Sequence, residues 1–228
     1  MSHPPATPPR WRTPTLLLLL FALPIFGSIY RLFTLAFAQV TGLVDPTIAH
    51  IASNPLPMAL HAAGGAIFCT LGAFQFRSQP TPAARKWHRY AGRVTAVAGF
   101  TFALSGLWCL WAYPAQSDSA AAVLPIRAIA CIAIAATLTL GIKSAMRRNI
   151  KAHRTWMIRT VAITAGPVTQ AYMLLLAEVF WGGASQFVQG LLILLSWLVS
   201  ISIGEWIILR PATHLSEMFK TPHRTTAK

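Results

Sequence analysis

Six long apolar runs alternate with short polar segments along the chain, and this pattern predicts the architecture. The runs cover residues 15–37, 57–76, 91–112, 121–142, 157–180 and 187–209. A helix needs about 20 residues to cross the hydrocarbon core of a bilayer, where backbone groups must be hydrogen-bonded within the chain. We therefore expect an all-α, polytopic membrane protein with six transmembrane helices.

Polar segments flank this membrane domain, which we place at residues 15–210. Residues 1–14 are rich in proline and predict a disordered leader, whereas residues 211–228 predict a basic cytoplasmic tail.

The first apolar run has two interpretations. Arg10 and Arg12 precede a leucine run, and residues 36–38 (Ala-Phe-Ala) resemble the cleavage site of a signal peptide. However, the run is longer than a normal signal sequence, and Arg31 interrupts its end. These two features favour a retained first helix.

Composition excludes a water-soluble domain. Hydrophobic residues make up 55% of the chain and charged residues only 11%, against about 25% charged residues in an average soluble domain. The three cysteines, Cys69, Cys109 and Cys131, lie in apolar runs without metal-ligand spacing, so we interpret them as packing residues. The chain has only five acidic residues, which argues against a paired-carboxylate hydrolase or a divalent-metal site.

The net charge of +14 is best interpreted through its distribution. The 19 basic residues fall mainly in four blocks, which are Arg10–Arg12, Arg77–Arg93, Lys143–Arg159 and Arg210–Lys228. With six transmembrane helices, all four blocks lie on one side of the membrane. Because Lys and Arg stay on the cytoplasmic side, we expect an inner (cytoplasmic) membrane protein with both termini in the cytoplasm. Membrane lipids are then the expected partners, and nucleic acid is not.

Two arginines depart from this distribution. Arg31 and Arg127 lie near the outer ends of the first and fourth predicted helices. A cation at such depth is expected to face the bundle and find a partner, and Glu178 is the candidate partner for Arg127. The alternative is that both arginines extend to the outer membrane interface.

Two stretches of the chain resemble each other, at about 57–112 and 121–180. Each contains Thr-Leu-Gly, then an arginine, then Lys-x-His-Arg and a further arginine, in the same order. We interpret them as two similar helical hairpins that form a four-helix core, although chance similarity between apolar helices is the alternative. Duplicated membrane folds place functional sites at the repeat interface.

His88 and His153 occupy matching positions in the two stretches. Imidazole suits haem iron and arginine suits carboxylates, so one hypothesis is that the two histidines ligate the iron of haem b. The haem propionates would then bind arginines that follow the histidines, namely Arg89, Arg93, Arg154 and Arg159. The alternative is that these residues anchor the protein to lipid phosphates at the membrane interface.

His61 is a further candidate for cofactor binding, because a titratable group inside a predicted span is costly and usually faces the interior. It shares a helical face with small residues, which would let a flat macrocycle or a neighbouring helix approach closely. The alternative is a packing histidine, hydrogen-bonded across the bundle. At 1.5 Å per residue, His61 lies roughly 24 Å from Arg77, so it cannot share a ligand with His88.

The motifs together resemble a family of bacterial predicted membrane proteins, domain of unknown function 2306. The resemblance covers the second to fifth apolar runs and rests on His61 and Gly65, Gly72-Ala73-Phe74-Gln75-Phe76, His88-Arg89-x-x-Gly92-Arg93, Ser105-Gly106, and His153-Arg154-x-Trp156-Met157-x-Arg159. The chain departs from the family at Gln170, where members often carry arginine. The histidine-bearing core is more distantly similar to cytochrome b561-like proteins, which implies haem b by fold-level analogy.

Two classes of function follow from these observations. One is a haem-b-binding transmembrane redox protein. The other is a non-redox transporter or membrane scaffold that binds anions or lipid headgroups at the cytoplasmic face. An intramembrane enzyme is a third, less favoured class.

Overall fold

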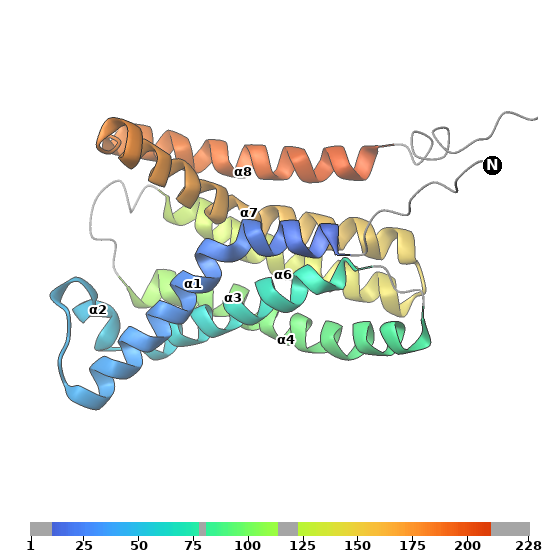
Figure 1. The fold of residues 1–228 in the computed structure, drawn as a ribbon, viewed down its shortest axis with the longest axis horizontal. Coiled ribbons are helices and arrows are strands. Elements are labelled where there is room, and N and C mark those ends of the chain that lie inside the picture. The colour runs from blue at the N-terminus through green and yellow to red at the C-terminus, as the bar shows by residue number, and fades with distance from the viewer. Residues whose placement is uncertain (1–10, 78–80, 114–122, 211–228) are drawn as a thin grey trace, which may run out of the picture.

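The structure, a computed structural model, describes residues 11–77, 81–113 and 123–210, and this part of the chain is helical without strands (Figure 1). Six of its helices are long and apolar enough to cross a membrane: α1 (Arg12–Thr41), α3 (Leu56–Gln75), α4 (Pro82–Ala112), α6 (Leu124–Met146), α7 (Ile150–Trp181) and α8 (Gln186–Leu209). A short 3-10 helix, η1 (Pro46–Ile48), and α2 (Ala49–Ala52) lie between α1 and α3. The prediction of an all-α fold with six apolar spans is confirmed.

The long helices form a bundle in which sequential neighbours pack side by side. Helix α3 packs on α4, α4 on α6, and α6 on α7, while α1 contacts both α3 and α7 and so closes the ring. Helix α8 packs on α7 at the edge of the bundle (Figure 1). The predicted four-helix core corresponds to α3, α4, α6 and α7, and in each predicted hairpin a shorter helix precedes a longer one.

Helices α4 and α7 begin earlier than the hydrophobic pattern predicts. The Thr81 hydroxyl accepts a hydrogen bond from the Ala84 N–H, and the Asn149 side chain accepts one from the Ala152 N–H. Both caps satisfy backbone donors that the first turn leaves free. The basic segments that we expected to be loops are therefore mostly helical, and both His88 and His153 stand within helices. Hydropathy marks the part of a helix inside hydrocarbon, not its continuation into the headgroup region.

Other predicted boundaries fall only partly within the described residues. Helix α1 begins at Arg12, so the end of the predicted leader is helical, and it continues through residues 36–38 to a C-cap at Gly42 with φ 71°. Residues 1–10, the turn that contains Asp118, and the tail from 211 to 228 lie outside the described part of the chain.

Apolar side chains fill the middle of the bundle. Phe68 of α3 is buried together with Phe21 of α1, Ala98 of α4, and Ala165 and Val168 of α7. A methyl group at Gly99 would lie 2.9 Å from both Phe68 and Leu138. The ring of helices is therefore closed at mid-depth by packed side chains, and any polar site has to lie nearer one of its ends.

Helices α3 and α4 make a particularly close crossing. A Cβ atom at Gly64 would lie 2.9 Å from the backbone nitrogen of Phe102 and 3.0 Å from the carbonyl oxygen of Ala98. Small residues allow this approach in membranes, where helix association depends on van der Waals packing. The crossing fixes the two helices that carry His61 and His88 relative to each other.

Candidate functional site at the basic end of the bundle

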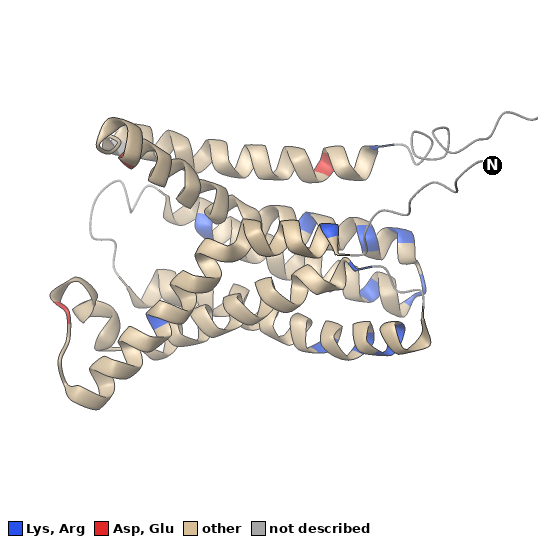
Figure 2. Cartoon of the chain, viewed as in Figure 1, with Lys and Arg blue, Asp and Glu red and all other residues tan. Residues whose placement is uncertain are grey.

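The charged residues are distributed unevenly between the two ends of the bundle. One end holds the start of α1, the α3–α4 and α6–α7 connections and the end of α8, and we call it the basic end. We call the opposite end the far end. Figure 2 shows that Lys and Arg gather at the basic end. Among the described acids, Asp45 and Glu178 lie toward the far end, and Glu205 lies near the basic end of α8.

Gln75, His88 and His153 are partly buried polar residues at the basic end, on three different helices, and we call them the polar cluster. His88 lies in the second turn of α4, and His153 lies in the first turn of α7. Gln75, the last residue of α3, faces the same side of α4, because a methyl group at Gly92 would lie 3.3 Å from its Oε1. The structure therefore places the two histidines at the same end of the bundle, and their pairing around a ligand stays a prediction.

One of the two histidines is oriented by a backbone carbonyl. His153 Nδ1 lies 2.9 Å from the Gly141 carbonyl oxygen of α6. A carbonyl can only accept, so Nδ1 carries a proton, and Nε2 has a lone pair when the imidazole is neutral. This arrangement fixes the ring and leaves Nε2 as an acceptor or a ligand atom.

Three buried nitrogens at this end lack hydrogen-bond partners. They are Gln75 Nε2, Arg77 Nε and His88 Nδ1, and none of them finds an acceptor in the structure. The guanidinium of Arg77 stacks on Trp11, with 4.1 Å between its Cζ and the ring centroid. Buried polar groups are nearly always satisfied, so three such atoms near one end of the bundle require an explanation.

The arginines predicted to surround a ligand lie elsewhere. Arg89, Arg93 and Arg154 are exposed. His88 and His153, which directly precede Arg89 and Arg154, are partly buried, because neighbouring helical residues point about 100° apart. Arg93 lies beside Tyr90, with 5.7 Å between its Cζ and the ring centroid. These arginines form a rim around the polar cluster rather than its lining.

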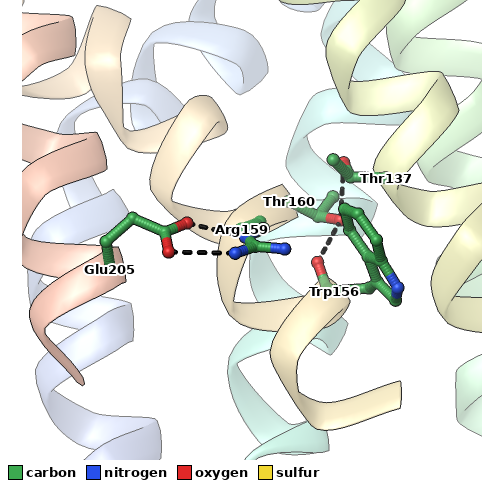
Figure 3. Close-up of polar contacts among 5 residues, drawn as sticks. All are labelled: Thr137, Trp156, Arg159, Thr160 and Glu205. Carbon is green, nitrogen blue, oxygen red and sulfur yellow. Dashed lines mark hydrogen bonds and ion pairs between the residues drawn. The ribbon is translucent and has the colours of Figure 1, made fainter. Parts of the chain in front are cut away.

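Arg159 forms a bidentate ion pair with Glu205 of α8, which sequence reasoning missed. Arg159 Nε donates to Glu205 Oε1 at 2.6 Å and Nη2 donates to Oε2 at 3.0 Å (Figure 3). The Arg159 guanidinium also lies 4.8 Å from the Trp156 ring centroid. One feature of the sequence could have indicated this pair. Glu205 is a single acid near the end of a strongly apolar helix, and an acid at that depth needs a cation as its partner.

Residues adjoining the ion pair tie α6 to α7. Figure 3 shows Thr160 of α7 between Thr137 of α6 and the carbonyl of Trp156. The Thr160 hydroxyl lies 2.9 Å from the Thr137 hydroxyl and 2.9 Å from the Trp156 carbonyl oxygen. Polar contacts on both faces of α7 thus link it to α6 and α8.

The predicted ion pair between Arg127 and Glu178 does not form. Both residues are described and both side chains are exposed, so neither is buried against the other. Glu178 instead lies at the end of α7 against the following turn, where a methyl group at Gly183 would lie 3.1 Å from its Oε2. Among the described residues, no acid forms an ion pair with Arg127.

His61 lies apart from the cluster, toward the far end. Its Nδ1 donates to the Phe102 carbonyl at 2.9 Å, and its ring stacks on that of Phe102 with centroids 4.4 Å apart. The imidazole also lies next to Gly106, where a methyl group would be 3.2 Å from its Cε1. The described contacts of His61 are those of a residue that packs α3 against α4.

Within the described ranges, no group of three or more His, Cys, Asp or Glu side chains is arranged to hold a metal ion.

The Arg159–Glu205 pair can be tested by a double-mutant cycle with Arg159→Met and Glu205→Gln. Both side chains are about one-third exposed (34% and 35%), so we expect a coupling free energy of only about 0.5–1 kcal/mol, decreasing with salt. Thermal unfolding in detergent would measure it. Strictly additive effects of the two substitutions would contradict the pair's contribution to holding α8 on α7.

Comparison with known proteins gives one match. A family model described as predicted membrane protein (DUF2306) matches residues 58–208, which run from α3 into α8. The searches of curated proteins and of solved structures gave no match.

Proposed function

We propose a function for this chain, which belongs to the DUF2306 family of predicted membrane proteins: it binds the phosphate or carboxylate group of an anionic ligand at its basic end. Membership of the family confirms the resemblance carried by the motifs between His61 and Arg159.

The unpartnered nitrogens of Gln75, Arg77 and His88 carry the proposal. Gln75 Nε2 and Arg77 Nε can only donate hydrogen bonds. Leaving such a donor buried and unpaired costs about 1–3 kcal/mol, and an oxygen-rich anion would remove this cost. Because the three nitrogens have almost no exposed surface, their side chains must rotate to meet a ligand.

Among the described residues near this end, no acidic side chain is free to accept hydrogen bonds from these donors. Glu205 is the described acid near this end, and Arg159 already occupies both of its oxygens. The exposed rim of Lys86, Arg89, Arg93 and Arg154 raises the local concentration of anions. Lipid phosphates, free phosphate and free carboxylates all offer the acceptor oxygens that these donors need. Titration with a lipid and with a free anion distinguishes between these sources.

Haem b is a second candidate ligand, favoured by the paired histidines. His88 stands on α4 and His153 on α7 at the same end of the bundle, and the bond from His153 Nδ1 to the Gly141 carbonyl is the kind of contact that orients ligating histidines. These two residues would hold the iron, and haem would supply one-electron transfer. The arginine assignments fit less well, since Arg159 is bound to Glu205 and the others are exposed.

The orientation of the bundle follows from the same charges. Among the described basic residues, Arg31 and Arg127 alone lie toward the far end. We therefore propose that the basic end faces the cytoplasm in the inner membrane, which places both termini there.

Gln75→Leu and His88→Phe test the anion site. A bound anion at 100 times its Kd would stabilise the wild-type protein by about 2.7 kcal/mol. We expect inorganic phosphate or short-chain phosphatidylglycerol to raise the thermal unfolding midpoint, with chloride at equal ionic strength as the blank. Both variants should lose this shift without losing stability in the absence of ligand, because each removes a buried nitrogen that has no hydrogen-bond partner.

Arg147→Gln is the matched control, since it removes an exposed cation at the same end and should keep the shift. A response to phosphatidylglycerol alone would identify a lipid headgroup, and a response to phosphate a free anion. An equal shift in Gln75→Leu and wild type would contradict the proposal.

An absorption spectrum tests the haem candidate. Protein expressed with ample haem and purified in mild detergent should show a Soret band that sharpens on dithionite reduction. His153→Ala should abolish or shift this band, whereas His61→Ala should leave it in place. Absence of the band in wild-type protein would eliminate haem b as the ligand.

Reporter fusions test the orientation. A green fluorescent protein fused after Lys228 should fluoresce, and alkaline phosphatase at the same position should be inactive. Alkaline phosphatase inserted at Gly183, between α7 and α8, should be active. The reverse pattern would overturn the orientation.

A further inference from the structure

A cavity of about 460 Å³ lies at the far end, between the second half of α1 and the segment that follows it. Its lining combines one cation, Arg31, and one anion, Asp45, with apolar and aromatic side chains that include Phe33, Phe37 and Leu43. The site at the basic end does not involve these residues, and the inference does not depend on the function proposed above.

Local structure explains why the chain is hollowed here. Helix α1 ends at Thr41 with Gly42 as its C-cap. The chain then turns back so that α2 packs on α1 through a buried group of Leu35, Ala38, Ile51 and Ala52. Gln39 of α1 donates to the Ala52 carbonyl at 2.9 Å and fixes this return. The segment between the two helices therefore stands beside α1 as a second wall.

The two charges of the cavity do not neutralise each other. No ion pair joins Arg31 to Asp45, although both are described. Asp45 Oδ1 accepts hydrogen bonds from the backbone N–H and the hydroxyl of Thr47, each at 2.8 Å. These bonds lower the pKa of Asp45 below its ordinary value, so the carboxylate is ionised at neutral pH and its Oδ2 remains available.

The walls favour an amphiphile over a simple ion. Phe33, Phe37 and Leu43 are 66%, 47% and 68% exposed, and they lie beside Arg31 on the outward face of α1 and the following turn. In a bilayer, these side chains contact acyl chains. A ligand that satisfies the whole lining has an anionic group, a cationic group with N–H donors, and an apolar body.

We propose that this cavity binds a zwitterionic phospholipid with a primary amine headgroup, of the phosphatidylethanolamine type. Arg31 binds the phosphate through its planar fork of donors. Asp45 accepts hydrogen bonds from the ammonium group, and the acyl chains lie against Phe33 and Phe37. The cavity then anchors the end of α1 to one headgroup of the leaflet at the far end.

Native mass spectrometry of protein released from nanodiscs tests this assignment. The nanodiscs contain equal amounts of phosphatidylethanolamine, phosphatidylglycerol and phosphatidylcholine with the same acyl chains. We expect wild-type protein to retain phosphatidylethanolamine about fivefold more than either other lipid. Arg31→Gln should lower this retention, and Asp45→Asn should remove the preference over phosphatidylglycerol while keeping the acceptor for Thr47.

The matched controls each remove one charge, a cation or an anion, from a residue that does not line the cavity. Arg127→Gln and Glu178→Gln alter a cation and an anion toward the same end and should retain the wild-type preference. Loss of the preference in these controls, or equal retention of all three lipids by wild type, would overturn the proposal. Preference for phosphatidylcholine would exclude the hydrogen-bonding role of Asp45, and displacement by free phosphoethanolamine would identify a soluble ligand instead of a lipid.

Discussion

The absence of water inside a bilayer is the constraint on which this structure depends. A polar group that is left unpaired in hydrocarbon costs several kcal/mol, so the backbone forms helices and the polar side chains bond within them. Thr95, Thr164 and Ser200 illustrate this, because each hydroxyl donates to the carbonyl four residues earlier. The same demand explains why His61 and Trp197 each donate to a backbone carbonyl of a neighbouring helix.

The two ends of the bundle contain polar groups that depart from this rule. The middle is closed by Phe68, Leu138 and their neighbours, and it contributes stability without evident chemistry. At the basic end, three buried side-chain nitrogens remain without a hydrogen-bond partner. At the far end, Arg31 and Asp45 share a cavity without pairing. Both ends therefore hold polar groups that the described residues leave without a hydrogen-bond or ion-pair partner.

Helix α7 connects these features mechanically. It presents His153 to the polar cluster, Thr160 to α6 and Arg159 to α8. Gly166 lets α8 approach closely, because a side chain there would collide with Trp197. A ligand that contacts His153 would thus act on α7, whose polar contacts reach both α6 and α8.

The sequence by itself determined the six apolar spans, the helical class, the gathering of basic residues at one end, and the family. It also paired His88 with His153 through their matching positions. Each of these features depends on the order of apolar and charged residues along the chain, which is set by the thickness of the bilayer and by the side on which cations stay.

Only the tertiary structure decided which side chains meet. It joined Arg159 to Glu205, left Arg127 and Glu178 apart, and placed Arg31 and Asp45 around one cavity. The physical reason is that a transmembrane helix is apolar on its lipid face as well as on its packed face. Periodicity therefore does not specify how each helix is rotated. That rotation follows from the close packing of small residues such as Gly64 and Gly166, and it determines whether a charge points toward a partner, a ligand or the lipid.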